Sequence, residues 1–121
     1  MADRRKTILV VEDEPLLRLA AIDIVEEAGF EALDAADADQ AIAILETRPD
    51  IHIVFSDIQM PGDMDGLKLA AYIRNRWLPI VLILTSGYVA PYELNLPEGG
   101  LFFAKPYRQN EVAEAFRRAA A

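Results

Sequence analysis

The sequence predicts a doubly wound α/β fold, in which helices cover both faces of a five-stranded parallel sheet. Short apolar runs, rich in β-branched residues, alternate along the chain with stretches that have helical spacing. This alternation is typical of parallel sheets. The chain has 121 residues, about half of what a closed β/α barrel needs. We therefore expect one domain, residues 1–121, built on an open sheet.

The first half of the chain contains three predicted strands and two predicted helices. The strands are the apolar runs at 8–11, 32–35 and 51–55. The first helix, 15–29, begins with a proline and ends with a glycine, which suit a first helical turn and a C-terminal stop. Its expected inward face comprises Leu17, Ala20, Ala21, Ile24 and Ala28. The second helix runs to Glu46, and its N-cap is Asp37 or Asp39.

The second half contains two more strands and at least two helices. Five consecutive apolar residues at 80–84 indicate a central strand, and 101–104 is the fifth strand. Met64 or Asp65 opens the third helix, whose inward side comprises Leu69, Ile73 and Trp77. Asn110 is expected to cap the last helix. Prolines and a Gly-Gly pair interrupt 87–100, which predicts a short or irregular fourth helix with one turn near 92–96.

The composition excludes several classes of function. Without cysteine there is no disulfide, thiolate metal site or cysteine nucleophile, and His52 is the only histidine. The net charge of -8 argues against direct nucleic-acid binding, because phosphate binding needs a basic face. No apolar stretch is long enough for a signal peptide or a membrane span. We expect a cytoplasmic protein that contacts neither nucleic acid nor membrane directly.

Ligands of open parallel sheets bind beyond the carboxyl ends of the strands. The residues following the first, third, fourth and fifth strands are 12–14 (Glu-Asp-Glu), 56–58 (Ser-Asp-Ile), 85–87 (Thr-Ser-Gly) and 105–107 (Lys-Pro-Tyr). In the flavodoxin-like strand order 2-1-3-4-5, the first and third strands are neighbours. Glu12, Asp13 and Asp57 are therefore expected in one pocket.

Three carboxylates in one pocket repel each other. Two unit charges about 4 Å apart cost about 4 kcal/mol at an effective dielectric constant of about 20. Either one carboxylate is protonated or a cation is bound, and oxygen ligands suit Mg²⁺. Lys105 adds a positive charge suited to a phosphate, and a hydroxyl at the end of the fourth strand can donate to an anion. The set indicates phosphoryl transfer, which works by positioning and charge neutralisation.

Five motifs in order, 10–14 (VVEDE), 56–61 (SDIQMP), 64–66 (MDG), 85–87 (TSG) and 105–106 (KP), span essentially the whole chain. Together they resemble the receiver domain of two-component response regulators. The resemblance implies that Asp57 accepts a phosphoryl group from the phosphohistidine of a partner histidine kinase or histidine phosphotransfer protein. It also implies that Lys105 binds the phosphoryl group and precedes a cis proline, Pro106.

The resemblance implies a Mg²⁺ site as well. Asp13, Asp57 and the backbone carbonyl of Gln59 would be direct ligands, and Glu12 would act through metal-bound water. Phosphorylation would then draw a hydroxyl toward the phosphoryl group, and the aromatic ring of Phe102 would fill the space it leaves. This switch changes a surface that binds a downstream protein target.

The hydroxyl residue is Ser86 or Thr85. The family usually has one residue between the proline and Met-Asp-Gly, and this chain has two. The usual span from Asp57 reaches Thr85, and the extra residue moves the match to Ser86. We favour Ser86 because a hydroxyl followed by glycine fits a tight turn near an anion. Adjacent strand residues point to opposite sides, so only one can face the phosphoryl group.

The predicted function is a signalling switch that catalyses only its own phosphorylation and dephosphorylation. One alternative is a hydrolase of the haloacid dehalogenase type, but these usually have a second aspartate where this chain has Gln59. Another is a flavodoxin-like cofactor binder, whose phosphate loop would not be Glu-Asp-Glu. A third is a receiver-like module that binds partners without being phosphorylated.

Overall fold

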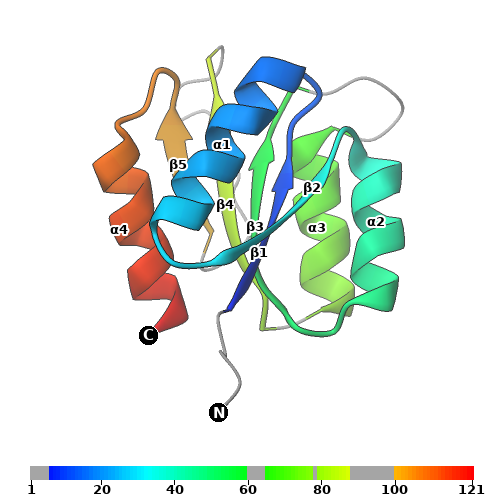
Figure 1. The fold of residues 1–121 in the computed structure, drawn as a ribbon. Helices are drawn as coiled ribbons and strands as arrows, with labels where there is room; N and C mark the ends of the chain where they lie inside the picture. Colours follow the sequence, from blue (N-terminus) through cyan, green and yellow to red (C-terminus); the bar gives the residue numbers. More distant parts are fainter. Residues whose placement is uncertain (1–5, 60–64, 78, 88–99) are drawn as a thin grey trace.

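The computed structural model describes residues 6–59, 65–77, 79–87 and 100–121, and in it the described strands form one parallel sheet (Figure 1). The strand order is β2-β1-β3-β4-β5, and each neighbouring pair is parallel. The predicted fold class and strand order are thus confirmed. The strands are β1 (Thr7–Val11), β2 (Glu31–Ala35), β3 (Ile51–Asp57), β4 (Val81–Ser86) and β5 (Leu101–Ala104).

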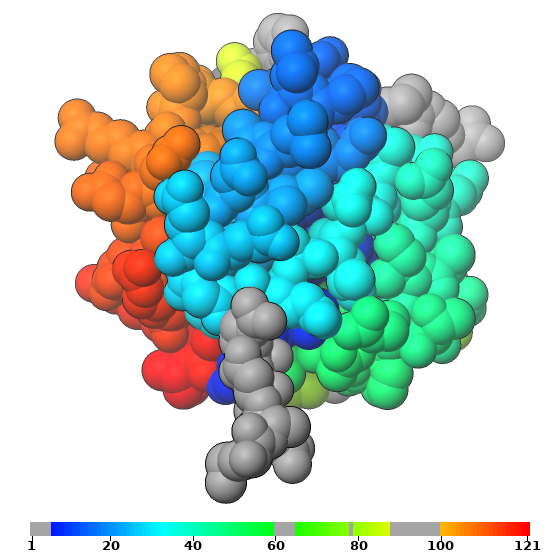
Figure 2. Space-filling view, viewed as in Figure 1, coloured from blue at the N-terminus to red at the C-terminus, as the bar shows by residue number. Residues whose placement is uncertain are grey.

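The helices cover the sheet on both sides. They are α1 (Pro15–Glu27), α2 (Ala38–Thr47), α3 (Gly66–Arg76) and α4 (Gln109–Ala120). On one face α1 and α4 lie side by side (Figure 2) and pack against the strands, and α2 and α3 cover the other face (Figure 1). The predicted short fourth helix falls within 88–99 and so lies outside the described residues. The helix labelled α4 is the last helix of the chain.

Alternate residues of the central strands enter two different cores. In β1, Leu9 and Val11 pack with α2 and α3, whereas Ile8 and Val10 pack with α1 and α4. The same alternation continues through residues 53–55 of β3 and 82–84 of β4, which is why the middle of each strand is apolar. This parity of the strands also decides which way each residue at their carboxyl ends points.

The described helix starts settle two alternatives and correct one prediction. The Asp37 carboxylate accepts the Gln40 N–H at 2.8 Å, so Asp37 is the cap of α2. Asp65 accepts the Lys68 N–H at 2.9 Å and caps α3. The prediction that Asn110 caps the last helix is wrong. The helix begins at Gln109, because the Arg108 carbonyl already accepts the N–H of Val112 at 3.1 Å.

The sequence predicted the C-terminal end of α1 better than its N-terminal end. Gly29, with φ of 96°, follows the end of α1 as predicted, because glycine adopts this left-handed conformation without strain. The inward face predicted for α1 holds at Ala21 and Ile24 but fails at Leu17, which is 46% exposed, and Ala20 is exposed as well. Leu17 lies in the first turn of α1, four residues before the buried Ala21.

Candidate functional site

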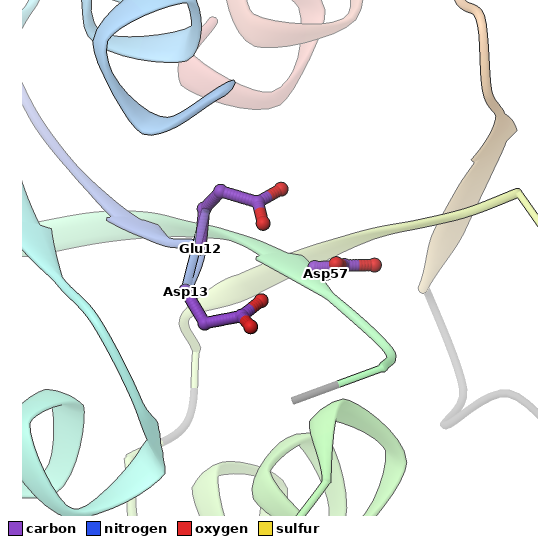
Figure 3. Close-up of side chains that lie close together, drawn as sticks. All are labelled: Glu12, Asp13 and Asp57. Carbon is purple, nitrogen blue, oxygen red and sulfur yellow. The ribbon is translucent and has the colours of Figure 1, made fainter. Parts of the chain in front are cut away.

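The ends of β1 and β3 bring three carboxylates together (Figure 3). Val11 pairs with Ser56 in the sheet register, so Glu12 and Asp57 follow at the same level. One carboxylate oxygen from each of Glu12, Asp13 and Asp57 lies within 4.8 Å of the others. Glu12 is 6% exposed and Asp57 is 7% exposed, whereas Asp13 is exposed. The pocket that the sequence predicted is therefore present in the fold.

Lys105 reaches this cluster from β5, across the end of β4. Its ammonium group donates to Glu12 Oε1 at 3.1 Å and lies 3.2 Å from Asp57 Oδ2. The other oxygen of Glu12 accepts the backbone N–H of Glu14 at 3.2 Å. The pocket thus holds three carboxyl groups and one ammonium group, which contacts Glu12 and Asp57.

The charges and burial of the cluster change the affinities of its groups for protons. Burial raises the pKa of Glu12, and the nearby Asp57 charge adds to this effect, although Glu14 and Lys105 oppose it. Burial alone would lower the pKa of Lys105, but the hydrogen bond to Glu12 and the charges of Asp57 and Glu12 outweigh it and raise that pKa. Ionisation of Glu12 is therefore disfavoured, while the ammonium form of Lys105 is stabilised.

The second oxygen of Asp57 fits the requirements of a cation ligand. Asp57 Oδ1 is buried and has no hydrogen-bond partner among the described residues. A buried carboxylate oxygen without a partner is costly, and Asp57 belongs to a cluster of oxygen donors that suits a hard divalent cation. Lys105 contacts the other oxygen of Asp57. Asp57 Oδ1 is therefore available to a metal ion.

The chain after Asp57 is held by backbone contacts on both sides. The Ile58 N–H donates to the Thr85 carbonyl at 2.9 Å, and the Ile58 carbonyl accepts the Gly66 N–H at 2.8 Å. A Cβ atom at position 66 would lie 2.2 Å from the backbone oxygen of Asp57. Only glycine permits this close approach, so the start of α3 lies directly against the end of β3.

Thr85 and Ser86 point to opposite faces of the sheet. Thr85 pairs with Asp57 and shares its face. Ser86 lies two residues after Leu84 and therefore on the same face as Leu84, the face that Phe102 also occupies. The Ser86 hydroxyl donates to Gln59 Oε1 at 2.7 Å, a contact absent from the sequence-based expectations. A long amide side chain two residues after Asp57 was its only signal in the sequence.

Arg18 is a further residue that the sequence analysis missed. Its guanidinium donates to the Glu12 carbonyl at 2.9 Å and pairs with Asp34 at 3.2 Å. It therefore ties the segment that carries Glu12 and Asp13 to the end of β2. Nothing in the local sequence signals this contact, because Asp34 belongs to another strand.

The remaining predicted residues lie around the same end of the sheet. Phe102 is half-buried against the core formed with α2 and α3, and the Lys105–Pro106 peptide bond is cis, as the resemblance implied. The Tyr107 ring packs edge-on to Phe55, with 5.7 Å between ring centroids. Burial raises the pKa of the Tyr107 phenol.

Comparison with known proteins identifies the family. The model of the response regulator receiver domain matches residues 8–117, and the chain belongs to this family. The chain is 31% identical to the hydrogenase transcriptional regulatory protein HoxA of Cupriavidus necator, over 98% of this chain and 25% of that protein. The sensor kinase CckA of Brucella abortus is 32% identical, over 88% of this chain and 12% of the kinase. The chain thus spans a quarter or less of these two curated relatives.

Solved structures agree with this assignment. The response regulator protein TrrA of Thermotoga maritima, in complex with Mg²⁺ and BeF, is 27% identical with a TM-score of 0.85, covering 94% of this chain and 98% of that one. This chain is therefore a receiver domain of two-component signalling systems, which act as signalling switches. Among the described residues, no helix combines the length and hydropathy needed to cross a membrane.

Proposed function

We propose that Asp57 accepts a phosphoryl group from the phosphohistidine of a sensor histidine kinase or a histidine phosphotransfer protein. The observation that carries this proposal is the state of the Asp57 carboxylate. It is buried, one oxygen contacts Lys105 at 3.2 Å, and the other has no partner among the described residues. A nucleophile held in this way has a fixed orientation and a cation beside it.

In the proposed transfer, a carboxylate oxygen of Asp57 attacks the phosphorus atom of the donor phosphohistidine. The O–P bond forms as the P–N bond breaks, and the electron pair of the P–N bond goes to the imidazole nitrogen. An ionised carboxylate is already a nucleophile, so no side chain needs to remove a proton. Lys105 neutralises the negative charge that arrives with the phosphoryl group. Catalysis then consists of positioning and electrostatics.

We propose Mg²⁺ as the cation of the acidic cluster. Asp13, Asp57 and the backbone carbonyl of Gln59 would hold it directly, and Glu12 would act through metal-bound water. When bound, the ion would neutralise the carboxylates and the phosphoryl oxygens. The buried, unpartnered Asp57 Oδ1 and the all-oxygen donor set support this assignment.

For the switch, we propose that the Ser86 hydroxyl moves toward the phosphoryl group and that the Phe102 ring fills the space it leaves. Support comes from the face that the two residues share. Thr85 is the alternative, because it lies beside Asp57 in the sheet. Variants Ser86→Ala and Thr85→Val distinguish the two, since only loss of the switching hydroxyl should weaken the response to phosphorylation.

We propose that residues 1–121 form a single receiver domain whose output is contact with a downstream protein. HoxA is named as a transcriptional regulator and CckA as a sensor kinase, so relatives place similar domains in different full-length proteins. The net charge of -8 favours a protein rather than nucleic acid as the direct target. The cytoplasmic location expected from the sequence stays a prediction.

Intact mass measurement after incubation with acetyl phosphate tests the proposal. With Mg²⁺, the wild-type protein should gain one phosphoryl group, and Asp57→Asn should gain none. Asp50→Asn, which alters a carboxylate at the other end of the sheet, is the matched control and should be phosphorylated normally. A gain that persists in Asp57→Asn contradicts the assignment. Rapid consumption of acetyl phosphate without accumulation would favour a hydrolase.

A further inference from the structure

The Gln59 side chain connects the segment after Asp57 to the end of β4. The Ser86 Oγ–H donates to Gln59 Oε1 at 2.7 Å. Ser86 is 1% exposed and Gln59 is half-buried, so water competes little for this hydrogen bond. Ser86 is also the residue for which we propose the switching movement.

A serine hydroxyl has only one proton to donate. While that proton is donated to Gln59, it is not available to a phosphoryl oxygen on Asp57. The movement of Ser86 toward a phosphorylated Asp57 therefore requires the hydrogen bond to Gln59 to break. The same bond stabilises the arrangement that precedes phosphorylation.

The backbone of Ile58, directly before Gln59, is held by two other elements. Ile58 donates to the Thr85 carbonyl of β4 and accepts from Gly66 at the start of α3. These contacts anchor the residue that precedes Gln59. The movement that the proposed switch requires here is a rotation of the Ser86 side chain away from Gln59.

We propose that Gln59 is a positioning residue that holds the Ser86 hydroxyl in the unphosphorylated state and so sets how readily the domain switches. This inference rests on the proposed function, because it assumes that Ser86 is the switching hydroxyl. It concerns the Gln59 side chain and is separate from the role proposed for its backbone carbonyl. A side chain that cannot accept the hydrogen bond should remove this restraint on the Ser86 hydroxyl and favour the switched state.

The variant Gln59→Met tests this role. Methionine has a similar length and no charge, and it leaves the backbone carbonyl in place, but it offers no comparable acceptor. The measurement is the concentration of beryllofluoride, formed from beryllium chloride and sodium fluoride, that half-saturates the protein at saturating Mg²⁺, followed by amide NMR signals. We expect Gln59→Met to lower it by about two- to tenfold, the contribution of one neutral hydrogen bond.

The same substitution in a Ser86→Ala background provides the decisive control. Without the Ser86 hydroxyl, Gln59→Met should leave the half-saturating concentration unchanged, because the two residues then have no interaction to lose. Thermal unfolding of all four proteins checks that each is folded. Equal changes in both backgrounds would overturn the proposal, since Gln59 would then act on the bound group without Ser86.

Three further outcomes are separate from these. No change on Gln59→Met in the Ser86 background would overturn the positioning role while leaving the proposed function intact. Failure of the wild-type protein to bind beryllofluoride in Mg²⁺ would instead count against the proposed function itself. If Thr85→Val rather than Ser86→Ala removed the effect of Gln59→Met, the role of Ser86 would be overturned.

Discussion

At the carboxyl end of the sheet Lys105 faces Glu12 and Asp57, while at the amino end Arg48 faces Glu31 and Asp50. Arg48 binds both oxygens of Asp50, at 2.9 and 2.7 Å, and contacts Glu31 at 2.9 Å. This second cluster is largely exposed. Both ends combine one basic side chain with carboxylates, yet their environments differ.

The difference appears in the proton affinities. Hydrogen bonds from Arg48 lower the pKa of Asp50 to about 2, whereas burial raises the pKa of Glu12. At the amino end the hydrogen bonds of the basic group satisfy the carboxylates. At the carboxyl end one oxygen of Asp57 has no partner among the described residues. Such unsatisfied, buried charge is typical of sites that bind or react, and a satisfied exposed pair is typical of a surface contact.

The largest expected difference between the two ends comes from removing the basic residue of each in turn. Lys105→Met should lower the initial rate of phosphorylation by acetyl phosphate about 100-fold, because it removes the positive charge beside the phosphoryl group. Arg48→Met should leave the rate within about twofold of the wild-type value, since its cluster lies at the opposite end of the strands. Intact mass against time measures both rates. Equal rates for Lys105→Met and the wild-type protein would refute the role of Lys105.

A smaller effect is expected from Glu12→Gln in metal-free buffer. Because the pKa of Glu12 is raised in the folded state, folding opposes its ionisation, and this destabilisation develops as the pH rises above the ordinary value of 4.5. The variant should therefore unfold at a slightly higher temperature than the wild-type protein at pH 7. The difference should vanish below about pH 4. Thermal unfolding across this pH range measures it, and a lower melting temperature at pH 7 would contradict it.

The smallest effect, with the opposite sign, is expected from Asp50→Asn. The lowered pKa of Asp50 contributes stability that is present above its ordinary value of 3.8 and is lost as the pH falls toward about 2. The variant should be slightly less stable at pH 7 and equal to the wild-type protein near pH 2. High salt should shrink the difference, because exposed pairs are screened. A stability difference that depends on neither pH nor salt would show that packing causes it.

The sequence predicted the features that follow from strand ends. Strand order and parity place Asp57, Glu12 and Lys105 at one end of the sheet, because apolar runs end where the polar residues begin. At the amino end of the sheet, the ends of the strands did not predict the charged cluster in the same way. The pairing of Arg48 with Glu31 depends on how the end of α2 meets the start of β2, and no spacing along the chain encodes that.

Predictions failed where a side chain depends on more than the pattern of its own element. Leu17 has the helical phase of the buried Ala21 and Ile24, yet it is 46% exposed in the first turn of α1. Asn110 is a good capping residue, but the backbone of Arg108 already accepts the first helical hydrogen bond. The contact between Gln59 and Ser86 joins residues 27 positions apart. Propensity and periodicity describe one element at a time and do not include such contacts.

The close approach of Gly66 to the Asp57 backbone also bears on insertions and deletions in the chain. Since a Cβ at position 66 would lie 2.2 Å from the Asp57 oxygen, the register of α3 is set where its first residue meets β3. The additional residue that precedes Met-Asp-Gly in this sequence lies upstream of that contact. Leu69 and Ile73 remain fully buried in the core. Changes in length are thus compatible with the domain before position 66, whereas an insertion just after it would rotate every core residue of α3 by about 100°.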